Sequence, residues 1–382
     1  MTDDRKEQND HILNTYMAGS SIGNIYKITT WGESHGAALG VVVDGCPSGI
    51  PISEEIIQKY MDRRKPGQSV FSTPRKEADQ IEILSGVFEG QTTGTPISMM
   101  VRNTSQRSGD YSEIASYYRP GHADYTFDAK YGFRDYRGGG RSSGRETIGR
   151  VAGGAIAIEA LRQLGVRFTT YVRSIGDIEI DDQAFDTDEI MKNALYMPDA
   201  AAAERASTYI TEMSRNHDSV GGVVECVVDG LPTGIGDPVF EKLSANLAKA
   251  ICSIGAVKGF EIGDGFRVSH AAGSANNDAF IMKDGHITPA TNHAGGVLGG
   301  ISSGAPLIFR AAFKPTPSIL HTQNTVNKDH EEIEISIKGR HDPIIPPRAV
   351  VVVEAMAGIT IFDSMLMNMT ARMDSVKDFY NK

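Results

Sequence analysis

The chain has 382 residues, of which 40% are hydrophobic and 23% are charged, a composition typical of a globular protein long enough to bury a large core. Its net charge of -10 argues against a nucleic-acid-binding protein, because contact with a phosphate backbone needs a positive surface. Between residues 119 and 150, however, seven basic side chains stand against four acidic ones. Since the planar guanidinium group suits carboxylates and phosphates, this local excess predicts a small anionic ligand.

The N-terminal segment and the longest apolar stretch bear on localisation. Residues 1–17 are polar and lack the apolar core of a signal peptide, so we expect a disordered extension followed by a single domain over residues 18–382. The apolar stretch at 349–369 carries Glu354 and Asp363, which indicates a buried element rather than a membrane span. These features predict a cytoplasmic protein.

Two segments far apart in the chain are alike. Residues 41–50 read VVVDGCPSGI and residues 226–235 read CVVDGLPTGI, with seven of ten positions identical. Each has the pattern of a strand that ends in an Asp-Gly turn, and helical patterns follow at 53–64 and 238–253. We therefore predict two similar halves related by a pseudo-twofold axis. The alternative is that this is merely a common strand-turn sequence.

The remaining elements predict the fold class. An apolar pattern predicts a helix over 142–165, because Ser142 or Ser143 can cap its start and Gly165 its end, and a second helix is expected at 201–215. Strands and helices do not alternate regularly, so we expect an α+β fold with mainly antiparallel sheets. The expected strands are 22–30, 222–229, 260–268, 307–313 and 332–338.

Histidines occur in two short glycine-containing motifs. Residues 32–36, GESHG, fit the pattern of a hydrolase nucleophile elbow, but a strand and not a helix follows, so Ser34 is rejected as a nucleophile. His35 could instead project from a turn. In RPGHAD, Arg119 and His122 flank a Pro-Gly turn. This is either an anion-binding arginine beside a proton donor or an exposed surface loop.

The stretch RDYRGGGRSSGRET at 134–147 is the most informative. Its three glycines allow close approach of a ligand to the backbone, and its serines supply hydroxyl and N–H groups at a helix start, where an anion is favoured. Arg137, Arg141 and Arg145 add bidentate donors. The stretch predicts a phosphate or carboxylate cradle. A flexible basic loop would not need serines leading into an apolar helix.

Two proline-rich segments are further candidates. Residues 339–348, GRHDPIIPPR, precede the buried apolar stretch and form either the wall of a site or a salt-bridged entry to the core. Residues 314–318, KPTPS, cannot be helical or lie inside a sheet. Their lysine and hydroxyl groups could hold a phosphate or a ring carbonyl.

The chain lacks the common metal and dinucleotide motifs. No CxxC, HExxH, calcium loop or GxGxxG is present, so neither a metal nor a Rossmann-type cofactor site is predicted. The cysteines are widely separated and are interpreted as buried thiols in a reducing compartment. They are Cys46, Cys226 and Cys252.

Taken together and in this order, GESHG, RPGHAD with DYRGGGRSSGRET, and RHDPIIPPRAVVVVEAM resemble the signature regions of the chorismate synthase family. SIGAVKGFEIGDGF, NHAGGVLGGISSG and FKPTPS resemble further family segments, and the resemblance covers residue 18 to the C-terminus. It implies a β-α-β sandwich, with a helical layer between antiparallel sheets and internal pseudo-symmetry, and a homotetramer. The implied reaction is the 1,4-anti elimination of phosphate from 5-enolpyruvylshikimate 3-phosphate to give chorismate. It requires reduced FMN without net redox change.

The resemblance also implies roles for individual residues. His35, His122 and Asp342 match the catalytic positions, and Arg64, Arg119 and Arg145 match positions that hold substrate or NADPH. The implied FMN contacts are Arg141, Ser142, Ser143, Gly255, Ala256, Gly299, Lys314, Pro315, Thr316, Pro317, Ser318 and Arg340.

This chain departs from the family pattern at two of its positions. Val70 stands where many members carry a second arginine, which Arg75 or Lys76 could replace, and Gly255 stands where some members have asparagine. A flavin oxidoreductase and a non-catalytic phosphometabolite-binding protein remain alternative interpretations. No motif for a nicotinamide site is visible, so NADPH is expected only as a reductant, and the lack of a recognisable reductase domain favours an outside source of reduced FMN.

Overall fold

The computed structural model describes residues 19–65, 67, 78–103, 113–337 and 342–381. The expected N-terminal extension at 1–17 therefore lies outside the described residues, as do Val70, Arg75, Lys76 and Arg340.

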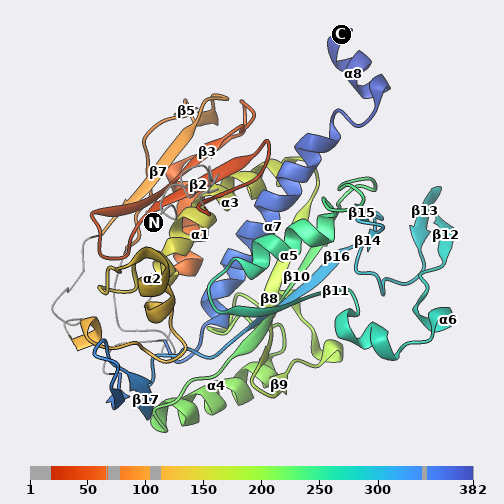
Figure 1. Cartoon of the computed structure of the whole chain (residues 1–382). Coiled ribbons are helices and arrows are strands. Elements are labelled where there is room, and N and C mark those ends of the chain that lie inside the picture. The colour runs from red at the N-terminus through yellow and green to blue at the C-terminus, as the bar shows by residue number, and fades with distance from the viewer. Residues whose placement is uncertain (1–18, 66, 68–77, 104–112, 338–341, 382) are drawn as a thin grey trace, which may run out of the picture.

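The first half of the chain forms a five-stranded antiparallel sheet (Figure 1). Its order is β1 (Ser21–Ile22), β2 (Lys27–Gly32), β3 (Ala38–Asp44), β7 (Ile97–Arg102) and β4 (Glu82–Ile83). Alternate residues of β3 and β7 are buried on one face, where Val41 pairs with Met99. This period of two is what a sheet with one covered face requires.

The second half forms a second five-stranded antiparallel sheet. Its order is β9 (Ile178–Glu179), β8 (Arg167–Ile175), β10 (Gly222–Asp229), β16 (Leu307–Phe313) and β11 (Val257–Ile262). Here Val224 of β10 faces the core and pairs with Ala311 of β16. The two sheets share a strand order. From β2 to β4 and from β8 to β11, neighbouring positions in the sheet are taken by the first, second, fourth and third of these four strands along the chain.

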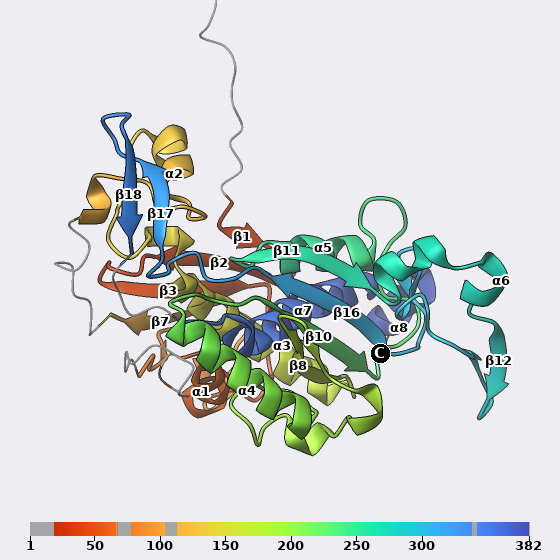
Figure 2. The same cartoon turned by 90° about the horizontal axis from the view of Figure 1, so that it is seen from below.

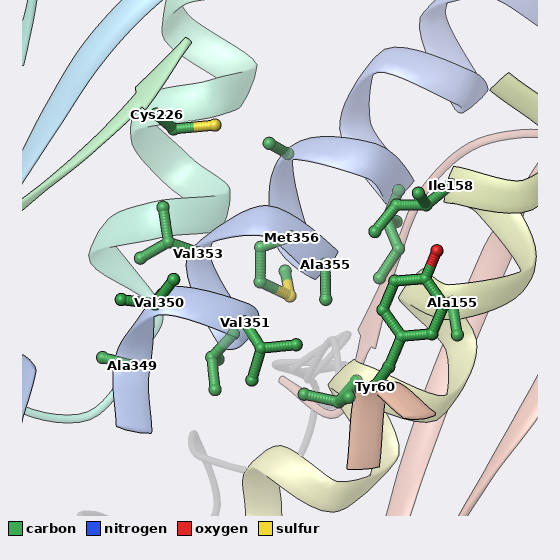
Figure 3. Packing of buried hydrophobic residues seen from close by; sticks show 14 of the residues in the cluster. Tyr60, Ala155, Ile158, Cys226, Ala349, Val350, Val351, Val353, Ala355 and Met356 are labelled. Atoms are coloured by element: carbon green, nitrogen blue, oxygen red, sulfur yellow. The ribbon is translucent and has the colours of Figure 1, made fainter. Parts of the chain in front are cut away.

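Two long helices lie between the sheets. Helix α3 (Thr147–Gln163) packs on β2 and β3, α7 (Pro346–Asn368) packs on β8 and β10, and the two helices pack on each other. In Figure 3, Val353 of α7 points toward Cys226 of β10 and Ala355 points toward α3. A Cβ atom added to Gly154 would lie 2.4 Å from Cβ of Ala355, so the helices approach so closely that only glycine fits there.

Helix α7 is long and apolar enough to cross a membrane, but 83% of its apolar window is buried inside this structure. It is a core helix, as expected for residues 349–369. Near its C-terminal end, the Asp363 carboxylate accepts hydrogen bonds from the backbone N–H groups of residues 24, 25 and 26, at 2.8, 2.7 and 2.9 Å. The last turns of α7 therefore hold the turn between β1 and β2.

The two similar sequence segments make equivalent turns after β3 and β10. The Thr92 hydroxyl donates to the carbonyl of Pro47 (2.7 Å) and accepts from the N–H group three residues further on (3.0 Å). Ser302 makes the same pair of bonds with Pro232 (2.6 Å) and the N–H three residues further on (2.9 Å). Helices α1 (Glu54–Arg64) and α5 (Leu243–Cys252) follow these turns.

Smaller elements lie around the two sheets. Helix α2 (Asp124–Tyr131) lies with β17 (Thr322–Val326) and β18 (Glu332–Ser336) at one end of the molecule, whereas α6 (Gly273–Asn276) with β12 (Phe280–Lys283) and β13 (His286–Pro289) projects at the other (Figure 2). The others are α4 (Ala200–Arg215), α8 (Met373–Tyr380), and the hairpins β5 (Val87–Phe88) with β6 (Gln91–Thr92) and β14 (Val297–Leu298) with β15 (Ile301–Ser302).

Several expected elements differ from the structure. The strand predicted at 260–268 is wrong beyond Ile262, because Gly263 adopts φ +56° and residues 265–270 form a 3-10 helix. The helix predicted from 142 begins as two 3-10 turns and becomes α-helical at Thr147, and that predicted from 238 begins at Leu243. The strand predicted at 22–30 is split in two. The interpretation of Cys252 as a buried thiol is also wrong, because its side chain is exposed.

Candidate active site

A cleft of about 1320 Å³ opens between segments of the two halves. Its lining residues come from the loop 138–147 and the RPGHAD turn on one side, and from residues 253–256 and 313–318 on the other. Among the residues that the structure describes, nine basic and four acidic side chains line it, although the whole chain has a net charge of -10. The basic ones are Arg64, Arg119, Lys130, Arg134, Arg141, Arg145, Arg150, Lys314 and Arg348.

The three glycines of the loop bring the two candidate histidines together. Gly138, Gly139 and Gly140 all adopt positive φ, at 63°, 84° and 53°, where side chains are disfavoured. A Cβ atom on Gly138 would lie 2.3 Å from Cδ2 of His35, and one on Gly139 would lie 3.1 Å from Cε1 of His122. From the sequence, these glycines are expected to make room for a ligand. In the structure they also make room for the imidazole rings of His35 and His122.

The GESHG turn is not a nucleophile elbow. The Ser34 hydroxyl donates to the carbonyl of Gly138 at 3.1 Å, and β3 follows the turn. Ser34 therefore anchors the glycine loop, and His35, which is 8% exposed, lies against it.

Asp124 orients His122 and Arg119. Its carboxylate accepts from Nε and Nη2 of Arg119 at 2.7 and 2.8 Å, and lies 3.0 Å from Nδ1 of His122. Burial alone would raise the pKa of Asp124, but the hydrogen bonds from Arg119 and His122 outweigh it and hold the pKa well below its usual value. Nδ1 of His122 therefore faces both the Asp124 carboxylate, which only accepts, and Nη2 of Arg119 at 3.0 Å, which only donates, while Nε2 is turned toward Gly139.

The serines of the cradle stabilise the loop that carries them. The Ser142 hydroxyl donates to the Gly139 carbonyl at 2.7 Å, and Ser143 accepts from the N–H of Arg145 at 3.4 Å. Arg141 donates to the Gly32 carbonyl at 3.2 Å and to the Thr30 hydroxyl at 2.7 Å, so it joins the loop to β2. All three predicted residues line the cleft.

Asp79 links two of the predicted arginines, and the sequence analysis missed it. Its carboxylate, with a side chain that is 0% exposed, pairs with Nη2 of Arg64 and lies 3.0 Å from Nη1 of Arg145. Burial lowers the pKa of Arg64, and Asp79 offsets this in part. Asp79 stands at φ +44°, a left-handed conformation that aspartate tolerates better than most residues. Nothing in its local sequence pattern marks this role.

Asp342 lies at the same end of the cleft. It pairs with Nη1 of Arg348, whose Nε donates to the backbone carbonyl of Arg64 at 3.1 Å. The predicted neighbour Arg340 lies outside the described residues.

The opposite wall contains the remaining predicted positions except one. Ala256, at φ +73°, accepts at its carbonyl from the N–H of Lys314 at 3.0 Å, and Lys314 Nζ donates to the Gly121 carbonyl at 2.5 Å. Burial, with a smaller contribution from Lys258, lowers the pKa of Lys314. Gly255, Thr316, Pro317 and Ser318 line this wall, beside Pro315 in the same turn.

Gly299 is the exception. It lies in the β14–β15 hairpin at φ +62° and is not brought to the cleft that the described residues form.

The described residues contain no group of three or more His, Cys, Asp or Glu side chains that could hold a metal ion.

Two histidines packed on one glycine loop, beside a cleft lined by arginines, are typical of an enzyme that acts on a small anionic molecule. A sequence model of the chorismate synthase family matches residues 26–366. The chain is 69% identical to the chorismate synthase of Agathobacter rectalis over 366 residues, which is 96% of this chain and 100% of that relative. It is 54% identical to that of Methanosarcina mazei over 355 residues, 92% of this chain and 97% of that relative. The chain belongs to the chorismate synthase family.

A solved structure agrees with the sequence relatives. A crystal structure described as chorismate synthase superimposes with a TM-score of 0.73 at 30% identity, covering 94% of this chain and 97% of that one. The match extends over both sheets and the helices between them, since it covers nearly the whole chain.

Proposed function

We propose that this chain catalyses the 1,4-anti elimination of phosphate from 5-enolpyruvylshikimate 3-phosphate to give chorismate, with reduced FMN as cofactor. The observation that supports this most is the surplus of basic side chains around His122 in one cleft, with His35 packed against Gly138 of the same glycine loop. The substrate carries two carboxylates and a phosphate, and guanidinium groups held in place before the reaction are suited to stabilising a departing phosphate. Arg119 and Arg145, each ion-paired on its buried side, would be held ready to bind these anions.

The cleft fits a flavin beside the substrate. At about 1320 Å³ it exceeds the roughly 300–1,000 Å³ typical of a site for one small molecule. Arg141, Ser142, Ser143 and the segment Lys314–Ser318 offer donors for a phosphate and a ring carbonyl, and the buried Thr316 hydroxyl has no hydrogen-bond partner among the described residues. Reduced FMN, when bound, would supply the electron density that assists loss of phosphate. Gly255 and Ala256 would present backbone to it, and Arg340 and Gly299 remain predicted contacts.

The titratable groups would move the protons. His122, whose ring is held at Nδ1 by Asp124 and Arg119, would use Nε2 for proton exchange with the leaving phosphate or the flavin edge. His35 lies against Gly138, the residue before the glycine that His122 contacts, and would serve the second proton position. Asp342 would take up a proton near N5 of the flavin ring, and Arg348 would orient its carboxylate. Arg64 is buried against Asp79 and would support the binding of substrate or NADPH.

The same proposal includes the organisation of the molecule. Residues 18–382 would form a single domain, a β-α-β sandwich with two similar halves, which the repeated strand order and the equivalent bonds of Thr92 and Ser302 support. The enzyme would act as a homotetramer in the cytoplasm, and NADPH would serve only as a reductant.

The deciding experiment is an anaerobic assay with 5-enolpyruvylshikimate 3-phosphate and dithionite-reduced FMN, following chorismate absorbance and phosphate release. Product with reduced but not oxidised FMN is expected, and replacement of dithionite by NADPH tests whether the chain reduces its own flavin. A folded, flavin-binding protein that forms no product would overturn the proposal in favour of an oxidoreductase or a binding protein.

A further inference from the structure

One acidic side chain lies between two arginines of the basic cleft. Glu146 lies at the end of the cradle loop, directly before α3, and is one of the four acidic residues in the lining, with its side chain 13% exposed. The sequence suggests only a favourable charge in the first turn of a helix. In the structure its two carboxylate oxygens point to different parts of the site.

The first oxygen joins Glu146 to the cradle. Oε1 accepts from the Thr30 hydroxyl at 3.0 Å, and the same hydroxyl accepts from Nη2 of Arg141 at 2.7 Å. Arg141 Nη2 itself lies 3.9 Å from Oε1. The position of Arg141, a proposed flavin contact, therefore depends on Thr30 and Glu146 together.

The second oxygen leads to the opposite wall. Oε2 accepts from Nε of Arg150 at 2.7 Å, and Arg150 in turn donates to the hydroxyl and the carbonyl of Ser253 at 2.6 and 3.1 Å. Ser253 lies two residues before Gly255 and three before Ala256, and the Ala256 carbonyl accepts from the N–H of Lys314. A continuous set of polar contacts thus runs from β2 through α3 to the loop after α5, across residues 103 positions apart.

This arrangement has a physical consequence for ligand binding. The two walls come from different halves of the chain, and a ligand that touches both loses affinity if their spacing fluctuates, because ordering must then accompany binding. The carboxylate thus interacts with two guanidinium groups, with that of Arg150 directly and with that of Arg141 through the Thr30 hydroxyl.

We propose that Glu146 is a positioning residue that fixes the two walls of the flavin site relative to each other through Arg141 and Arg150. The inference rests on the proposed FMN site. Glu146 is not expected to touch the reacting atoms.

The test is Glu146→Gln, with binding of oxidised FMN measured by quenching of its fluorescence at fixed ionic strength. Glutamine has one acceptor oxygen where glutamate has two, so in this geometry it can accept from Thr30 or from Arg150 but not from both, and it no longer carries the charge that faces the two arginines. We expect the Kd for FMN to rise about tenfold, whereas kcat at saturating flavin changes less than about twofold; tenfold corresponds to about 1.4 kcal/mol. Ser253→Ala removes the hydroxyl that accepts from Arg150 but keeps the backbone carbonyl that also accepts from it. This second variant should raise the Kd for FMN by about two- to threefold, and it tests the inference if Glu146→Gln does not fold.

Glu159→Gln is the matched control. Glu159 lies on the same helix, is 20% exposed, and accepts from Tyr60 at 2.6 Å and Arg162 at 3.1 Å, away from the cleft lining. Its substitution should leave the Kd for FMN unchanged. A Kd for Glu146→Gln or Ser253→Ala within the error of the unmodified protein would overturn the inference while FMN binding stands. Failure of the unmodified protein to bind FMN would instead overturn the proposed cofactor site, and the inference with it.

Discussion

Replacing Asp79 by asparagine should be among the most damaging single substitutions in this protein. The change keeps the size of the side chain but removes the charge that faces Arg64 and Arg145, whose side chains are 1% and 12% exposed. Removing one partner of a buried ion pair leaves the other charge without compensation and costs about 3–5 kcal/mol. We expect a loss of this size in the free energy of unfolding, measured by urea denaturation.

The matched control is Asp62→Asn. Asp62 pairs with Lys65 at 2.8 Å in the same part of the chain, but the two side chains are 47% and 33% exposed, and an exposed pair contributes at most about 1 kcal/mol. The Asp79 variant should also raise the KM for substrate at least about tenfold, because Arg145 loses its buried anchor. If both variants lose less than about 1 kcal/mol, the reasoning about this cluster is refuted.

Three further predictions follow from the site and the core. Asp124→Asn should lower the free energy of unfolding at pH values above the ordinary aspartate pKa near 4. The difference in this free energy between the variant and the unmodified protein should shrink as the pH falls below 4, because the pKa of Asp124 is lowered in the native state. A difference that stays constant from pH 5 to pH 3 in urea unfolding would contradict this. Gly138→Ala should lower kcat at least about 100-fold while the protein stays folded by circular dichroism, since its Cβ would lie 2.3 Å from His35; a loss below tenfold would show that the loop can shift. In thiol titration of the native protein only Cys252 should react quickly, because burial raises the pKa of Cys46 to about 12; rapid reaction of more than one thiol would show that the core opens.

Local sequence patterns predicted the strands well where the chain has a strong period of two. The predicted strands at 222–229 and 307–313 have the bounds of β10 and β16, and burial alternates along the whole of β16 and over residues 226–229 of β10. The pattern failed at 260–268, where apolar residues continue past Gly263 but the backbone turns. A glycine is required there because a Cβ atom would lie 2.1 Å from the carbonyl oxygen of His293, thirty residues away, and no local pattern carries that information.

The candidate site was predictable in its residue types but not in its connections. The cradle glycines, His122 and the arginines stand out because they are concentrated within 119–150. The contacts that orient them come from distant positions, as Asp79 to Arg145 and Ser253 to Arg150 show. The sequence indicates which segment supplies the ligand-binding side chains, whereas the partner of a buried charge is fixed only when the sheets and helices pack.

The hydrogen bonds from residues 24–26 to Asp363 join positions 337 to 339 residues apart. At a synthesis rate of about 5–20 residues per second, the ribosome needs roughly 17–70 s to reach Asp363 after the turn has been made. Throughout that time the nascent first sheet and α3 lack both this anchor and the apolar surface of α7. We therefore expect the first half to mature only after translation nears its end, and to depend until then on whatever shields exposed apolar surface in the cell.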